Sequence, residues 1–308
     1  MIYTITLNPA LDYIVHVEDL VVGGINCIQT EELKAGGKGI NVSMMLHTLG
    51  VENSAIALAA GETGAFLERV VKACGVNTDF IHLDSGYTRI NVKITAKEST
   101  AINGIGPIID ESVICEIKNK LGTLTSNDLV VLAGSLPATA QQSLYIDIIR
   151  SLQAFDTDII IDTVGRLLKD LLPFRPLLVK PNTDELGEYF GKSIGGTEDI
   201  IRHAKLLQSA GARNVLISRG NEGSILISED QKVFIGNCPG GAVVNTVGCG
   251  DSMVAGFIAG YARNKDVLEA YTLSIAASSS KAVCTTKVTP QFVQEMEKQV
   301  MITRVDTK

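Results

Sequence analysis

The residues best suited to chemistry lie near the C-terminus, in segment 245–256, which reads Asn-Thr-Val-Gly-Cys-Gly-Asp-Ser-Met-Val-Ala-Gly. Gly248, Cys249 and Gly250 can direct backbone amides at an anion, because glycine permits close approach and a helix N-terminus carries unpaired N–H groups. A carboxylate there would repel a bound phosphoryl group. Its presence is explained if it takes part in a reaction. Asp251 is therefore predicted to be the base that activates an accepting hydroxyl. The alternative is an ordinary helix start with an acidic first turn.

A second glycine-rich turn, at residues 35–41, reads Ala-Gly-Gly-Lys-Gly-Ile-Asn. It is not a Walker A loop, and it lacks the Gly-x-Gly-x-x-Gly spacing of a dinucleotide site, which argues against an oxidoreductase. The amides of Gly36 and Gly37, together with Lys38 and Asn41, suit a polyhydroxylated or phosphorylated ligand. A tight turn that only begins a helix is the alternative.

Positive charge for such a ligand is found in segment 87–103, where polar and apolar residues alternate. Side chains alternate across a strand, so the polar face is predicted to carry Arg89, Asn91 and Lys93, and the other face Ile90, Val92 and Ile94. Arginine clamps phosphate in bidentate fashion and lysine adds a point charge. An edge strand protected by charge is nearly as consistent with the pattern.

The elements that must position these residues follow a doubly wound α/β pattern with a mostly parallel sheet. Strands that are apolar on both faces are expected at 129–132, 158–161, 177–179 and 215–217. Helices are expected at 40–49, 253–263 and 267–283. Segments within about 12–32 and 87–103 do not fit the alternation of strands and helices, and we expect them to form a small projecting sheet, or lid. The whole chain, residues 1–308, is expected to be one domain.

Bulk composition excludes several classes of protein. The 27 basic and 34 acidic residues give a net charge of −7 without a basic run, which argues against a nucleic-acid surface. No apolar stretch approaches the roughly 20 residues of a spanning helix, and no signal peptide is evident, so a cytoplasmic protein without a membrane partner is expected. Six scattered cysteines and four histidines indicate neither a disulfide framework nor a zinc site.

Taken together, the two glycine turns resemble the two signatures of the ribokinase-like (PfkB-type) carbohydrate kinases. They read Gly36-Gly-Lys-Gly-x-Asn41 and Val247-Gly-x-Gly-Asp-Ser252, in the family's order and separation. Further matching segments lie between and before them, at 6–12, 134–137, 180–185 and 218–223, so the resemblance spans nearly the whole chain. It implies a ribokinase-like fold and phosphoryl transfer from ATP with Mg²⁺ as cofactor.

The resemblance also implies roles for single residues. Sugar hydroxyls would be held by Asp12, Gly36, Gly37, Asn41 and Ser135. The nucleotide would be bound by Lys180, Asn182, Ser218, Arg219, Gly220, Gly223 and Gly250, and Glu185 would reach Mg²⁺ through water. Structural alternatives remain open, because Asn182 and Glu185 could cap the helix after Pro181, and Asp12 could satisfy a turn.

Within the family, segment 88–93 is similar to the bacterial 1-phosphofructokinases. This implies transfer of the ATP γ-phosphoryl group to the 6-hydroxyl of fructose 1-phosphate, which gives fructose 1,6-bisphosphate. Tagatose-6-phosphate kinases share the overall pattern and are the alternative substrate class. A catalytically silent sugar-phosphate-binding regulatory module is the alternative from another class. The family also implies a homodimer through the lid strands.

Two positions depart from the family pattern. Cys249 stands where alanine is usual, and Val164 replaces a small polar residue. A small side chain that simply fits is the preferred interpretation of Cys249. The alternative hypothesis is that its position at a helix N-terminus lowers the thiol pKa, so that oxidation or alkylation would inhibit the protein.

Overall fold

The computed structural model describes residues 1–122, 124–141 and 143–305. Within these ranges, eleven strands form the main sheet, in the order β15-β14-β13-β12-β11-β10-β9-β1-β4-β5, with β6 beside β4. The strands β5, β6, β4, β1, β9, β10, β11 and β12 run parallel to their neighbours. The strands β13, β14 and β15 add an antiparallel edge beyond β12. The bounds are β1 Ile2–Thr6, β4 Asn53–Ala60, β5 Asn77–Thr78, β6 Ile81–Leu83, β9 Leu129–Ala133, β10 Asp158–Asp162, β11 Leu178–Val179, β12 Asn214–Ser218, β13 Ser224–Ile227, β14 Val233–Gly236 and β15 Ile302–Val305.

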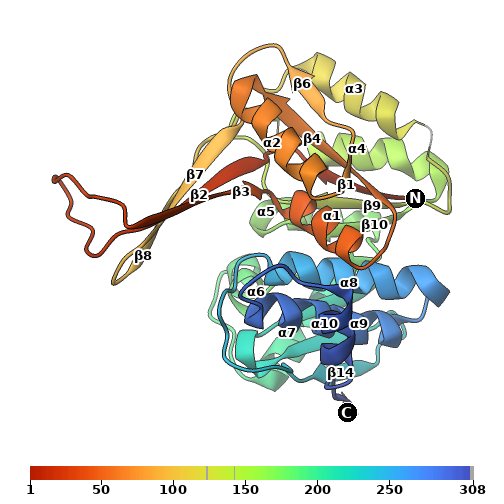
Figure 1. Cartoon of the computed structure of the whole chain (residues 1–308). Coiled ribbons are helices and arrows are strands. Elements are labelled where there is room, and N and C mark those ends of the chain that lie inside the picture. Colours follow the sequence, from red (N-terminus) through yellow and green to blue (C-terminus); the bar gives the residue numbers. More distant parts are fainter. Residues whose placement is uncertain (123, 142, 306–308) are drawn as a thin grey trace.

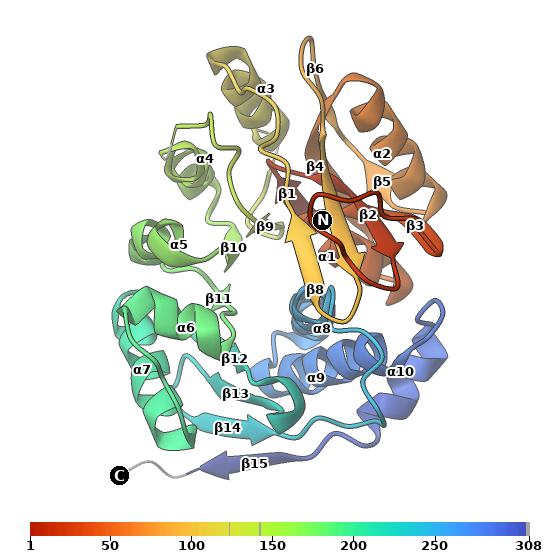
Figure 2. The same ribbon diagram turned by 90° about the vertical axis from the view of Figure 1, so that its left-hand side faces the viewer.

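Helices cover both faces of the main sheet, with α3 to α7 on one side and α1, α2 and α8 to α10 on the other (Figure 2). Successive strand residues feed the two cores alternately, so Ile159 and Ile161 pack in one cluster and Ile160 in the other. The bounds are α1 Lys38–Thr48, α2 Gly61–Ala73, α3 Glu111–Leu121, α4 Leu144–Leu152, α5 Gly165–Leu171, α6 Thr183–Phe190, α7 Thr197–Ser209, α8 Cys249–Asn264, α9 Val267–Val283 and α10 Pro290–Glu297.

A small sheet projects from this body (Figure 1). Its order is β3-β2-β7-β8, and its strands are β2 Ala10–His16, β3 Thr30–Gly36, β7 Arg89–Thr95 and β8 Ser99–Ile102. Register pairs Asp12 with Asn91 and Ala10 with Arg89, which places these side chains on one face. Near its base the opposite face is buried at Leu11 and Ala35. The small sheet is therefore anchored at one end and carries a polar face beside the body.

The predicted fold class is confirmed by this architecture. The four expected strands correspond to β9, β10, β11 and β12, and the expected helix 267–283 matches α9 at both ends. The largest boundary error is at α8, which begins at Cys249 rather than at 253, whereas α1 begins at Lys38 rather than at 40. Among the described residues, no helix is long and apolar enough to cross a membrane.

Candidate active site

Two neighbouring pockets lie where the carboxyl ends of the parallel strands meet the small sheet, the place where open α/β sheets bind ligands. The small-sheet pocket has a volume of about 340 Å³ and is lined in part by side chains of β2 and β7. The α8 pocket has a volume of about 440 Å³ and lies at the N-terminus of α8. The wall between them, here called the junction, consists of the residues that line both pockets, namely Lys38, Glu185, Gly248 and Asp251.

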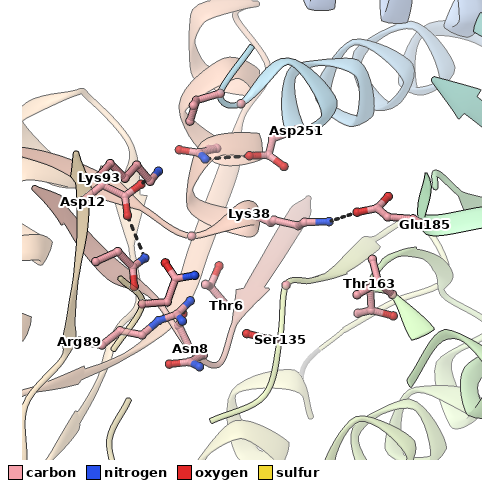
Figure 3. Close-up of a pocket in the computed structure, with 18 residues that line it drawn as sticks. Thr6, Asn8, Asp12, Lys38, Arg89, Lys93, Ser135, Thr163, Glu185 and Asp251 are labelled. Carbon is pink, nitrogen blue, oxygen red and sulfur yellow. Dashed lines mark hydrogen bonds and ion pairs between the residues drawn. The ribbon is translucent and has the colours of Figure 1, made fainter. Parts of the chain in front are cut away.

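The structure brings most of the predicted site residues to these two pockets. In addition to the junction, the small-sheet pocket is lined by Asp12, Gly37, Asn41, Arg89, Asn91, Lys93 and Ser135 (Figure 3). The α8 pocket is lined by Lys180, Asn182, Ser218, Gly220, Gly223, Cys249 and Gly250.

Asp251 occupies the first turn of α8, after Gly248, whose φ of 79° is in the left-handed region that favours glycine. The Asn41 amide donates to Asp251 Oδ2 over 2.7 Å, which links α8 to α1 and orients the carboxylate. Burial, and then the nearby Asp162 carboxylate, raise the pKa of Asp251 to about 6. The carboxylate is thus ionised at neutral pH but is far more basic than an ordinary aspartate, as a catalytic base should be.

Two lysines bring positive charge to the same place. Lys38 begins α1 and lies 3.7 Å from Glu185 Oε1 across the junction, while Lys180 follows β11 and is buried. Burial acts to lower the pKa of Lys38, but Asp162, then Glu185 and Asp251, raise it overall, so the ammonium remains charged. Positive charge therefore lies beside the predicted base.

Asp12 is the centre of a hydrogen-bonded group on the polar face of the small sheet. Asn91 Nδ2 donates to Asp12 Oδ1 over 2.9 Å, and Lys93 Nζ donates to Asp12 Oδ2 over 2.6 Å. Gly36 does not line the pocket, although it was predicted to hold sugar hydroxyls. A Cβ at Gly36 would lie 2.8 Å from Asp12 Oδ2, so glycine is needed for the carboxylate to approach β3. Lys93 is therefore committed to an ion pair rather than free to bind phosphate alone.

Arg89 lies deeper in the same pocket. Its guanidinium donates to the Asn8 carbonyl over 3.0 Å and to the Gly104 carbonyl over 3.3 Å, which fixes its plane. Burial lowers the pKa of Arg89, against the opposing charge of Asp12. Its Nε atom is buried and has no hydrogen-bond partner among the described residues. A guanidinium whose plane is fixed in a pocket is suited to an anionic ligand.

Asn182 and Glu185 form a capping box at the start of α6. Asn182 Oδ1 accepts from the Glu185 amide over 2.7 Å, and Glu185 Oε2 accepts from the Asn182 amide over 2.9 Å. The helix cap that the sequence analysis offered as an alternative is thus observed. Both residues nevertheless also line the α8 pocket. Capping uses Oε2 and leaves Oε1 of Glu185 at the junction.

Besides Gly36, two further sequence expectations fail at single residues. Arg219 does not line the α8 pocket, because its guanidinium donates to Thr197 and to the Glu222 carbonyl. The hypothesis of a lowered thiol pKa at Cys249 is wrong. Burial raises the pKa of this thiol to about 11, helped by Asp251, and the charge of Lys281 offsets only part of that rise.

Several lining residues were not predicted to bind a ligand. They follow main-sheet strands or line the adjoining loops, and they are Thr6, Asn8, Asn103, Gly134, Thr163, Val164 and Val247. Asp162, which ends β10, was also missed, although it contacts both lysines. The signal that could have found Asp162 and Thr163 is their position at the carboxyl end of an apolar parallel strand.

Comparison with known proteins agrees with this geometry. The sequence profile of the pfkB family carbohydrate kinases matches residues 6–291. A 1-phosphofructokinase of Bacillus subtilis is 37% identical over 305 residues, which cover 99% of this chain and 100% of that protein. A D-tagatose-1-phosphate kinase of Bacillus licheniformis is 34% identical, with 92% of each chain covered. Phosphofructokinase-2 from Escherichia coli, solved with substrates and products, superposes with a TM-score of 0.89 at 25% identity and covers 97% of this chain and 98% of its own.

Proposed function

The chain belongs to the pfkB family of carbohydrate kinases, and from this premise we propose that it phosphorylates fructose 1-phosphate at the 6-hydroxyl, with ATP as the donor. The observation that carries the proposal is the position of Asp251, in the wall shared by two pockets. A base in that wall can reach a hydroxyl on one side and face a phosphoryl donor on the other. Relatives over the full chain length that are named 1-phosphofructokinase support the choice of sugar.

In the proposed reaction, Asp251 accepts the proton of the 6-hydroxyl as the oxygen attacks the γ-phosphorus in line. Lys38 and Lys180, with the unpaired amides in the first turn of α8, offset the negative charge that develops on the transferring group. Arg89 binds the 1-phosphate at the far end of the small-sheet pocket. The small sheet covers the sugar and limits hydrolysis of ATP by water.

Mg²⁺ fits the junction through Glu185. Among the described residues, no group of three or more His, Cys, Asp or Glu side chains could hold a metal. Mg²⁺ in phosphoryl transfer commonly takes only one or two carboxylates, with substrate phosphates and waters completing its shell. Glu185 Oε1 faces the pockets while Oε2 is held by the cap, so it would contact the ion directly or through water. When bound, the ion would neutralise charge on the donor phosphates.

A tagatose phosphate is the second candidate substrate, because one relative is named a D-tagatose-1-phosphate kinase. Fructose and tagatose differ only in configuration at C4, so both 1-phosphates would place the same anion on Arg89. Discrimination would depend on the groups that face the ring, including Asp12 and Asn103.

The test is the initial rate of ADP release with Mg²⁺-ATP and each of five acceptors: fructose 1-phosphate, fructose 6-phosphate, tagatose 1-phosphate, tagatose 6-phosphate and none. We expect the highest kcat/KM with fructose 1-phosphate. A preference for a tagatose phosphate would support the kinase activity but contradict fructose 1-phosphate as the substrate. No turnover with any sugar would contradict the proposal and favour a silent sugar-phosphate-binding module.

We also propose a homodimer formed through the small sheet. Register places Leu33, Tyr13, Val92 and Ile102 in one row of its outer face, where Leu33 and Ile102 are 43% and 60% exposed. A tetrameric form of the Escherichia coli enzyme shows that a structural relative assembles. Light scattering should give a dimer for the wild type and a monomer for Ile102→Asp. Leu206→Asp is the control, because it makes the same kind of change at an exposed leucine of α7.

A further inference from the structure

Asp162 is a fully buried carboxylate that lines neither pocket. It ends β10, its side chain is 1% exposed, and its Oδ1 accepts a hydrogen bond from Lys38 over 3.2 Å. Lys180 Nζ lies 3.6 Å from the same oxygen. Its Oδ2 is buried without a hydrogen-bond partner among the described residues. One carboxylate outside the site therefore contacts two cations that line it.

Removing this charge would leave two ammoniums close together in a poorly solvated place. Burial acts to raise the pKa of Asp162, but Lys180 and Lys38 more than offset it, so the pKa is lowered and the group stays ionised. Lysine carries its charge on a long flexible stem, and each ammonium would otherwise sample several rotamers. Asp162 both offsets the repulsion between the two ammoniums and restricts the rotamers of the two lysines.

The two lysines differ in which substrate they meet. Lys38 lines both pockets, whereas Lys180 lines only the α8 pocket. A Cβ at Gly250 would lie 3.0 Å from Lys180 Nζ, so that ammonium is close to the amides of the first turn of α8. Both ammoniums thus lie beside the path from the α8 pocket to the small-sheet pocket.

We propose that Asp162 is a positioning residue that fixes Lys38 and Lys180 where the transferring phosphoryl group passes, without touching either substrate. Fixed charges stabilise a transition state well because they need no reorganisation during the reaction. The inference rests on the proposed kinase function and adds a residue that acts through two others.

Asp162→Asn is the main test, since asparagine keeps the shape and removes the charge. We expect kcat to fall about 100-fold, the size of effect seen when catalytic groups are misplaced by about 1 Å. ADP should bind about tenfold more weakly, because Lys180 loses its fixed position. KM for the sugar phosphate should change less, since its anion is assigned to Arg89.

The pH profile separates positioning from a purely structural role. The charged groups that act on Asp251 are Asp162 from β10, Lys38 from α1 and Lys180 after β11, with the neutral Asn41 as hydrogen-bond donor. Loss of the negative neighbour should move the acid limb of kcat/KM to lower pH, because kcat/KM reports the ionisation of the ligand-free protein. A variant that is merely less stable would have fewer folded molecules but an unchanged limb.

Asp158 provides a matched control at the other end of the same strand. It is also a carboxylate held by two cations, Arg213 at 2.7 Å and Lys265 at 3.5 Å, and it lies outside both pockets. Asp158→Asn should lower the melting temperature and leave kcat within about twofold and the acid limb unchanged.

Asp162→Glu is the second variant, for the case in which Asp162→Asn does not fold. It keeps the charge and displaces the carboxylate by one methylene, so kcat should fall while the acid limb stays at the wild-type pH. The proposal is overturned if Asp162→Asn keeps kcat and ADP affinity within about twofold. It is equally overturned if the asparagine variant is unfolded and Asp162→Glu has wild-type kcat. Should the wild type phosphorylate no sugar, the proposed function fails, and ADP titration calorimetry still tests the positioning of Lys180.

Discussion

The two ends of the candidate site are built in different ways. The end with Asp251 and Lys180 rests on the main sheet and α8, and both residues are buried, as is Asp162 behind them. The end with Arg89 and Lys93 rests on the small sheet, where β8 is exposed throughout and β3 is exposed along five of its seven residues. The comparison teaches that groups for chemistry are fixed by the core, while groups for recognition lie on a thin element that has less support.

This division has an energetic reason. A base whose pKa must be raised needs burial, and only the core supplies it. A phosphosugar must enter and leave, so the residues that bind it are better placed on an element at the edge of the fold. The predictions that follow test whether catalysis and recognition separate along this line.

The largest effect is expected at the core end. Asp251→Asn should lower kcat by about 10²–10⁴, the usual contribution of a positioned base, with little change in KM for either substrate. Steady-state kinetics with quantified active protein would measure this. Near wild-type kcat would remove Asp251 from its role as the base.

The same substitution should stabilise the fold at pH 8. The pKa of Asp251 rises from 3.8 to about 6 on folding, so the ionised carboxylate costs about 3 kcal/mol at high pH. The folded chain binds this proton more tightly, so the stability that comes from protonation is present below pH 3.8 and is lost as pH rises through 6. The advantage of Asp251→Asn should therefore shrink as pH falls, as measured by urea unfolding at pH 8 and pH 5. Equal stabilities at pH 8 would contradict the raised pKa.

The next effect is expected at the small sheet. Arg89→Ala should raise KM for the sugar phosphate about 10–100-fold, as for loss of a charge-assisted contact, and should leave KM for ATP nearly unchanged. Lys97→Ala is the control, because Lys97 lies in the same sheet's β7–β8 turn and pairs with Asp19 away from the pocket. If Arg89→Ala changed kcat more than KM, the separation between the two ends would fail.

A smaller effect concerns the pH dependence of the wild type. Asp251 must be ionised to accept a proton, so kcat/KM, which reports the ionisation of the ligand-free protein, should decline as pH falls through about 6, approaching a tenfold loss per pH unit below that. Initial rates at low sugar-phosphate concentration from pH 5 to 8 would show it. A flat profile down to pH 5 would contradict the assignment.

The fold class was predictable because the strands at 129–132, 158–161, 177–179 and 215–217 are apolar on both faces and alternate with helical stretches. The strand Asp158–Asp162 illustrates where prediction stops. Both of its aspartates flank the same apolar run, and only the direction of the strand separates them, because Asp162 is at the carboxyl end, where open α/β sheets bind ligands. The partners of Asp162 could not be predicted, because folding brings it to Lys38, which is 124 residues distant in sequence.

The start of α8 was missed for a related reason. Glycines at 248 and 250 predict a turn, yet Gly250 lies inside the first helical turn, where Lys180 leaves little room for a side chain. Helix propensity disfavours glycine, and tertiary packing overrides that preference. The thiol pKa of Cys249 shows the same limit. The helix N-terminus can be predicted from the sequence, but the burial that raises the pKa depends on tertiary packing.

The smallest effect is expected from modification of Cys249. At pH 7.5 a thiol with a pKa near 11 is almost entirely protonated, and the thiolate is the form that reacts. Iodoacetamide should therefore label the exposed Cys27 and Cys115 first and leave activity intact. Peptide mapping beside residual activity would follow this order. The Cys249→Ala variant should keep wild-type kcat and the same resistance, which would identify the residue as a small side chain that fits. Inactivation that parallels labelling of Cys249 at pH 7.5, and is absent in the variant, would show that the core end of the site is more open than its burial indicates.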